Sequence, residues 1–362
     1  LQCHSMSLNV SVALDRKSSI YLTGETISIE VHLENGGRNR EILAWGSVQL
    51  TCDRTFGRRK TLEGTTSTSI SKGAFNVFSS VPQVIFCDVD LLPGQSKTFT
   101  CKITIPINGI PPSFKGHYIR YVNRMTLAVA RIRSTVRMLH LPLRILSSVG
   151  IDSKSSRPSD PFLAQTTREP TISELHTVGV DEITAPRKPL IFSLTNERGK
   201  IATLTLFKKA FRMGEDVVGH LSFMGASLRT IQFTARLETM ENLQDGKNGS
   251  TENEPNISLI CKDERECSSL KETSFRLPIP MHISPSFATL NVNFKWRLRF
   301  EFTISDQFDL ELHDELDNLH QAPLEMEVDR LQWSCDLFVL PSTPFNIALT
   351  DESIFTPVSL SI

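Results

Sequence analysis

The sequence predicts an all-β protein made of two tandem β-sandwiches. Three observations lead to this prediction: apolar and polar residues alternate along many segments, several motifs recur in the same order in both halves, and the length of 362 residues fits two domains of ordinary size. Apolar residues make up 40% of the chain and charged residues 22%, which is the composition of a folded protein rather than a disordered one.

Alternating segments mark the expected strands. Residues 8–14 and 27–33 alternate in this way, and residues 294–302 do so most clearly. A strand places successive side chains on opposite faces of its sheet. We therefore expect one buried face that carries Phe294, Trp296 and Leu298. We expect an exposed face that carries Lys295, Arg297 and Arg299.

The second half of the chain repeats motifs of the first half. Tyr21–Ile27 recurs as Phe211–Val217, with the pattern aromatic-x-x-Gly-Glu-x-β-branched, and Pro112-Ser113-Phe114 recurs as Pro285-Ser286-Phe287. The remaining correspondences are 105–107 with 279–281, 121–125 with 294–298, and 140–146 with 334–340. Because the order is kept throughout, we interpret the chain as a duplication of one all-β unit of roughly seven strands.

The repeats place the domain boundaries. We expect sandwiches over residues 6–147 and 190–343, a polar linker rich in Pro and Ser over 148–189, and a tail over 344–362. The polar stretches 53–73, 241–272 and 305–326 are expected to be long loops. No long amphipathic helix is expected, and Asp314–His320 could form only a short helical turn.

The distribution of charge is the strongest functional signal. The net charge is only −1, but residues 1–148 carry a net +9 and residues 149–362 a net −10. Between Leu91 and Ile151 there are nine Lys or Arg residues and no acid. Three interpretations remain open: a solvated basic face, attraction between the two halves, and docking of an acidic protein or an anionic membrane. For docking, the candidate residues are Lys115, Arg120, Arg124, Arg131 and Arg133.

Motifs for covalent chemistry are missing from the sequence. There is no phosphate-binding Gly-Lys-Ser/Thr loop, no nucleophile elbow and no zinc-protease motif. The seven cysteines include no pair at metal-ligand spacing, so we expect reduced thiols, no metal and no cofactor. Glu25 and Glu215 occupy repeated turns and are therefore expected to be structural. No stacking platform accompanies the basic stretch and the pI is about 6.8, which argues against nucleic acid.

Several segments resemble those of a known family. The repeated Gly-Glu and Pro-Ser-Phe elements are similar to those of arrestin-like proteins. More specific segments resemble the Rgp family, the partner subunits of the Ric–Rgp exchange complex, and together they cover residues from about 40 to 340. They are 43–52, 84–88, 93–97, 111–116, 198–200, 207–208, 214–219, 277–280 and 295–298.

This resemblance implies a fold and a function. The fold would be two arrestin-like, immunoglobulin-like sandwiches. The function would be that of a subunit, without a covalent-chemistry active site, of a guanine-nucleotide exchange factor. Its partners would be the larger Ric-type subunit and a Golgi Rab GTPase, and it would be cytoplasmic, recruited to the Golgi membrane for retrograde endosome-to-Golgi traffic. The alternatives are an arrestin-like cargo or ubiquitin-ligase adaptor, or else a β-sandwich hydrolase or lectin.

Overall fold

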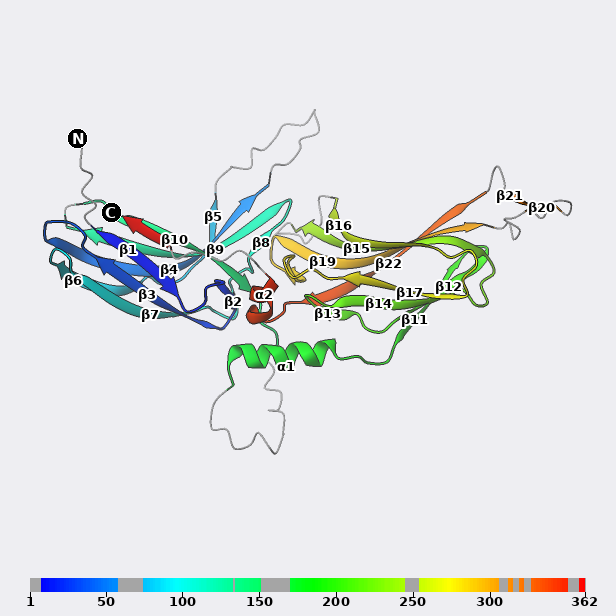
Figure 1. The fold of residues 1–362 in the computed structure, drawn as a ribbon, viewed down its shortest axis with the longest axis horizontal. Helices are drawn as coiled ribbons and strands as arrows, with labels where there is room; N and C mark the ends of the chain where they lie inside the picture. Colours follow the sequence, from blue (N-terminus) through cyan, green and yellow to red (C-terminus); the bar gives the residue numbers. More distant parts are fainter. Residues whose placement is uncertain are drawn as a thin grey trace, which may run out of the picture. The chain divides into compact units, whose positions relative to one another are not determined.

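The computed structural model describes residues 8–57, 74–132, 134–150, 170–244, 254–305 and 327–350, and the short stretches 312–314, 319–321 and 358–361. The chain divides into two compact units, one formed by Leu1–Gly179 with Thr343–Ile362 and the other by Val180–Ser342. Both units consist mainly of strands (Figure 1). The prediction of an all-β fold with two sandwiches is confirmed.

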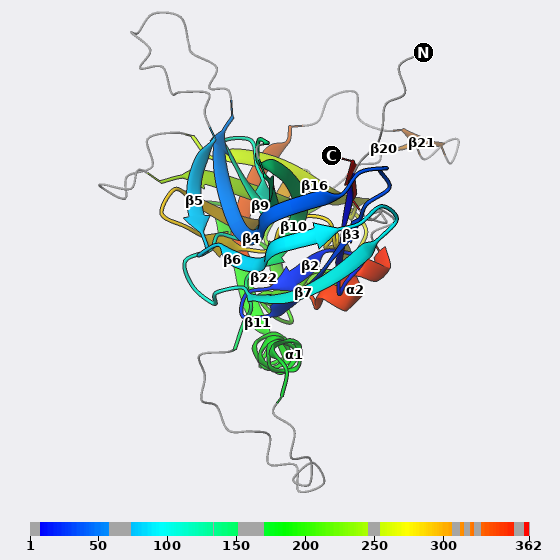
Figure 2. The same ribbon diagram turned by 90° about the vertical axis from the view of Figure 1, so that its left-hand side faces the viewer.

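The first unit contains two sheets. The smaller has the order β23-β1-β3-β7, and the larger β2-β10-β9-β4-β5, with β6 also paired to β4 and β8 to β9. Figure 2 shows β5 beside β4 at the edge of the larger sheet. The smaller sheet comprises β1 (Asn9–Leu14), β3 (Thr26–Glu34), β7 (Ser96–Thr104) and β23 (Val358–Ser361). The larger comprises β2 (Ile20–Leu22), β4 (Glu41–Phe56), β5 (Phe75–Ser79), β6 (Gln83–Leu91), β8 (Phe114–Lys115), β9 (Ile119–Arg131) and β10 (Arg137–Leu146).

The second unit repeats this topology. Its sheets have the orders β11-β12-β14-β17 and β13-β22-β19-β15-β16, with β18 paired to β19. In each unit the strand that precedes the Gly-Glu turn forms a parallel pair, β2 with β10 and β13 with β22. The strands are β11 (Leu190–Asn196), β12 (Gly199–Leu206), β13 (Ala210–Arg212), β14 (Asp216–Ser222), β15 (Arg229–Leu243), β16 (Asn256–Glu266), β17 (Glu272–Pro278), β18 (Phe287–Ala288), β19 (Val292–Ser305), β20 (Leu312–Asp314), β21 (Leu319–Gln321) and β22 (Asp329–Leu340).

The repeated Pro-Ser-Phe motif forms the same hydrogen bonds in each unit. Ser113 Oγ accepts a hydrogen bond from Ile145 N at 2.9 Å, and Ser286 Oγ accepts one from Val339 N at 3.0 Å. The backbone N–H of each serine donates to the carbonyl of the same strand residue at 2.8 Å. The serine therefore holds β10 in the first sandwich and β22 in the second, which explains why this short motif is present in both copies.

The alternating segment at 294–302 is strand β19, and its apolar face is core as predicted. Trp296 and Leu298 are fully buried, and Phe294 is buried. On the opposite face the Arg297 and Arg299 side chains are only 16% and 26% exposed, so the exposure predicted for these two residues is wrong, whereas the Lys295 side chain is 42% exposed. Both arginines form ion pairs with Glu238 of β15, whose side chain is 5% exposed.

Two helices also differ from expectation. Helix α1 (Ile172–Thr184) lies within the predicted linker, and α2 (Pro344–Thr350) lies within the predicted tail. A capping box begins α1: Thr171 N donates to Glu174 Oε2 at 2.7 Å, and Glu174 N donates to Thr171 Oγ1 at 3.3 Å. Its buried face includes His176 and Thr184 instead of a run of aliphatic residues. The usual apolar period of a helix is therefore weak.

Strands also replace much of the predicted loop sequence. Strand β16 occupies the middle of 241–272, and β4 continues through 53–56. Asp314 lies in β20 and His320 in β21, while residues 315–318, between these strands, lie outside the described residues. Strand β16 pairs with β15 alone at the end of its sheet and is polar along much of its length. An edge strand of this kind has no alternating apolar face from which it could be predicted.

Candidate partner-binding surface

The candidate surface is the solvent face of the larger sheet in the first unit. Along β9 the odd-numbered residues from Ile119 to Val129 are buried, so the even-numbered ones, including Arg120 and Arg124, face solvent. Strand β8 places Lys115 directly opposite Arg120 in an antiparallel pair. Residues directly opposite each other lie on the same face of a sheet, and both of these side chains are exposed.

Lys115 and Arg120 form a like-charged cross-strand pair. Such pairs destabilise a sheet when the charges face each other directly. Among the described residues, neither side chain has an acidic partner, since none of the ion pairs includes them. An anionic group placed between the two cations would remove the repulsion, so this end of the sheet suits an acidic ligand.

Arg124 and Arg131 differ from Lys115 and Arg120 because each already has an ion pair. Arg124 pairs with Asp53, and Arg131 pairs with Glu41. Both acids belong to β4, the neighbour of β9 in the sheet, and their side chains are only 12% and 11% exposed. Two of the positive charges in the stretch without acids are therefore neutralised by acidic residues of β4, which lie 70 or more residues away in the sequence. Arg133 lies outside the described residues.

The repeated Gly-Glu turn is a second charged feature, and its role is structural as predicted. Gly24 and Gly214 have φ values of 91° and 85°, a conformation that favours glycine. The following glutamate caps the turn: Glu25 Oε2 accepts a hydrogen bond from Leu22 N at 2.8 Å, and Glu215 Oε2 accepts one from Arg212 N at 2.9 Å. Arg16 binds Glu25 through two hydrogen bonds of 2.7 Å.

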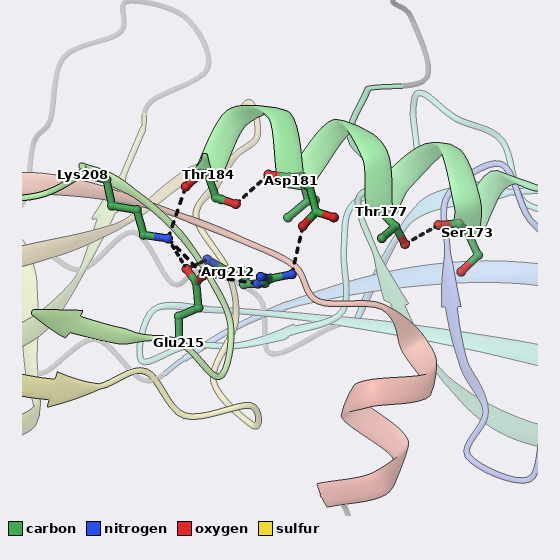
Figure 3. Close-up of polar contacts among 8 residues, drawn as sticks. Ser173, Thr177, Asp181, Thr184, Lys208, Arg212 and Glu215 are labelled. Atoms are coloured by element: carbon green, nitrogen blue, oxygen red, sulfur yellow. Dashed lines mark hydrogen bonds and ion pairs between the residues drawn. The ribbon is translucent and has the colours of Figure 1, made fainter. Parts of the chain in front are cut away.

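In the second unit the corresponding turn also holds the end of α1 (Figure 3). Lys208 Nζ donates to both oxygens of Glu215 and to the carbonyl of Thr184 in the last helical turn, at 3.2 Å. Arg212 forms an ion pair with Asp181 at 3.0 Å. A cation at the C-terminus of a helix stabilises it through the helix dipole, so this cluster fixes the last turn of α1.

The described residues contain no cluster of three or more His, Cys, Asp or Glu side chains that could hold a metal ion. Burial raises the pKa of the Cys52 and Cys267 thiols to about 12 and that of Cys335 to about 11. Since the thiolate is the reactive form, these cysteines are poor nucleophiles at neutral pH. In the part of the chain that the structure describes, no helix is long and apolar enough to cross a membrane.

The fold is a duplicated β-sandwich, and its first unit carries a charged sheet face. Comparison with known proteins gives the family: the Rgp1 family model matches residues 16–159 and 164–305, and the chain belongs to that family. The predicted family is thereby confirmed.

Two relatives match nearly the whole chain. A human protein named RAB6A-GEF complex partner protein 2 is 28% identical over 366 residues, which cover 91% of this chain and 93% of that protein. A protein of the same name from Bos taurus is 29% identical over 367 residues, covering 90% of this chain and 91% of that protein.

Proposed function

We propose that the chain is a subunit of a guanine-nucleotide exchange factor complex for a Rab GTPase. The observation that carries this proposal is similarity over nine-tenths of the chain to proteins named as RAB6A-GEF complex partners. The family model supports it independently, because the two matched segments include most of both sandwiches. The proposed partners are a larger Ric-type subunit and a Golgi Rab GTPase.

Exchange requires no nucleophile or general base on this chain. An exchange factor acts by binding the nucleotide-free GTPase more tightly than the nucleotide-bound form. A β-sandwich that offers a rigid, charged sheet face can supply part of that binding energy or hold the larger subunit in place. We therefore propose a non-catalytic or co-catalytic role, in the cytoplasm and at the Golgi membrane, in retrograde traffic from endosomes.

Protein binding fits the basic face better than membrane binding alone does. Each basic residue close to an anionic leaflet contributes about 1 kcal/mol. With Arg124 and Arg131 engaged by acids, Lys115 and Arg120 together would contribute only about 2 kcal/mol, which is too little for stable attachment. Membrane recruitment would then come mainly through the partners.

Nucleotide-release kinetics test the proposal. Fluorescent GDP release from a panel of Rab proteins is measured with this chain alone, with the larger subunit alone, and with both together. We expect release to be accelerated only by the two subunits together, and for a Golgi Rab. Substantial release by the purified chain alone would contradict the supporting role, and capture of a ubiquitin ligase without any exchange activity would favour the adaptor alternative.

A further inference from the structure

An exposed apolar patch lies on the same sheet face as Lys115 and Arg120, at the opposite end of β9. The register aligns Met138, Ala128, Ser47 and Val84 in one row across β10, β9, β4 and β6. Met138 is 58% exposed and Val84 59% exposed. An exposed apolar side chain therefore lies at each end of this row.

The next row adds an aromatic side chain. Trp45 of β4 lies opposite Ala130 of β9 and Cys87 of β6, and it is 36% exposed. Further apolar residues are exposed at the ends of these strands: Ile42, Ile132 and Val136. Single exposed apolar residues are normal on a protein surface, but a contiguous group with a polar margin marks an interaction site.

On this face, the basic residues and the apolar residues lie at opposite ends of β9. Ala130 lies ten positions after Arg120 along β9, which at about 3.3 Å per residue is a distance of about 33 Å. The Arg124–Asp53 ion pair and the hydrogen bond between Thr126 and His140 occupy the middle. The face thus has a basic end, a neutral centre and an apolar end that is bordered by the Arg40–Asp90 and Arg131–Glu41 ion pairs.

We propose that this face docks a folded protein whose contact surface has an apolar strip and, about 30 Å away, carboxylates. The proposal rests on the proposed function, in which the larger exchange-factor subunit is that protein. Trp, Met and Arg are enriched at protein interfaces relative to other surfaces. Carboxylates of the partner would also remove the repulsion between Lys115 and Arg120.

Two other occupants fit the face less well. A second copy bound through the same face would bring either two basic ends together, or a basic end against an apolar end, and neither arrangement is complementary. For membrane binding, the apolar side chains would have to insert into the acyl region of a bilayer. They lie within a sheet face and are partly covered by their neighbours, so they cannot insert as the side chains of a protruding loop do. The face is suited to a protein with a complementary surface.

The test compares charge introduced at two methionines of equal exposure. Met138→Glu places a carboxylate in the apolar patch, while Met224→Glu does so at a 59% exposed methionine in the second unit. Binding of each variant to the purified larger subunit is measured by biolayer interferometry, with thermal melting as a check on folding. We expect Met138→Glu to weaken binding at least 10-fold and Met224→Glu to leave it within twofold, with both melting temperatures unchanged.

The basic end is tested by charge reversal. Lys115→Glu with Arg120→Glu should slow association several-fold, and the loss should diminish as salt rises, because salt screens surface charges. The matched control is Lys17→Glu with Lys102→Glu, two exposed lysines of the same unit that lie in the turn after β1 and on β7 of the other sheet. Alkylation of Cys87, opposite Trp45, gives an independent readout, and we expect the bound subunit to protect it.

The outcomes separate the two proposals. A wild-type chain that does not bind the larger subunit overturns the proposed function and, with it, the occupant proposed here. A wild-type complex that Met138→Glu leaves intact, with Cys87 still labelled, overturns this surface alone. Loss of binding to anionic vesicles, rather than to protein, in the Met138→Glu variant would assign the face to a membrane and would also overturn the proposal.

Discussion

Asn123 of β9 and Trp296 of β19 form the same hydrogen bond in the two sandwiches. Asn123 Nδ2 donates to Pro111 O at 3.1 Å, and Trp296 Nε1 donates to Ser284 O at 3.0 Å. Each acceptor lies 12 residues before its donor and is the residue immediately before the Pro-Ser-Phe motif. An amide and an indole thus satisfy equivalent carbonyls, although the two side chains share little else.

Replacing Trp296 separates the contribution of this bond from that of packing. Trp296→Ala should lower the free energy of unfolding by about 3–5 kcal/mol, since it leaves a large cavity. Trp296→Phe keeps most of the volume and loses the indole N–H, and it should cost about 1–3 kcal/mol. Urea titrations that follow the unfolding of the second unit measure both values. Equal losses would show that the hydrogen bond, not the packing, dominates.

The sequence allowed the repeat, the β class and the core face of β19 to be predicted, because each depends on local pattern. Trp296 and Leu298 illustrate this: strand alternation alone places them in the core. The half-burial of the opposite face could not be predicted in this way. Arg297 is covered by pairing with Glu238, which is 59 residues away in the chain and becomes a neighbour only through the register of β15 with β19.

The candidate surface shows the same limit. The absence of acids around Arg124 and Arg131 is visible in the sequence, but their pairing with Asp53 and Glu41 depends on β4 lying beside β9.

Helix α1 could not be predicted from the sequence for a different reason. Its capping box at Thr171 and Glu174 is a recognisable start signal, whereas its polar buried face hides the apolar period.

Arg297 should matter far more than its position on a solvent-side face suggests. Arg297→Ala leaves the buried Glu238 carboxylate with only Arg299, 3.9 Å away, as an ion-pair partner. Breaking a buried pair typically costs about 3–5 kcal/mol, and we expect a loss at the lower end of this range, about 3 kcal/mol. Lys295→Ala removes an exposed pair with Asp336 and should cost about 1 kcal/mol or less. Chemical denaturation of the two variants tests this difference, and adding Glu238→Gln to Arg297→Ala should restore part of the loss. Similar costs for Arg297→Ala and Lys295→Ala would contradict the prediction.

The two turn glutamates should contribute unequally to stability. Glu25 is 6% exposed and has two hydrogen bonds to Arg16, whereas Glu215 is 22% exposed. Glu25→Ala should therefore cost about 3 kcal/mol and Glu215→Ala about 1–2 kcal/mol, because water compensates the more exposed site. Calorimetry of both variants checks the order. The reverse order would mean that the Lys208 and Arg212 contacts, which also hold the end of α1, are the stronger ones.

Thiol labelling should distinguish the cysteines by burial. Cys87 is exposed, whereas Cys52 and Cys267 are buried, with pKa values raised to about 12. At pH 8 a thiol with that pKa is about 0.01% thiolate, so its alkylation is slow even before steric shielding is considered. Iodoacetamide followed by peptide mass spectrometry should therefore label Cys87 at least 100-fold faster than Cys52 or Cys267 in the native protein.

Raising the pH to 9 should speed labelling of the buried thiols by at most 10-fold, because their pKa values lie far above both pH values. In 8 M urea the three rates should converge, which serves as the control. Native labelling of Cys52 at a rate close to that of Cys87 would mean that β4 is not buried as described.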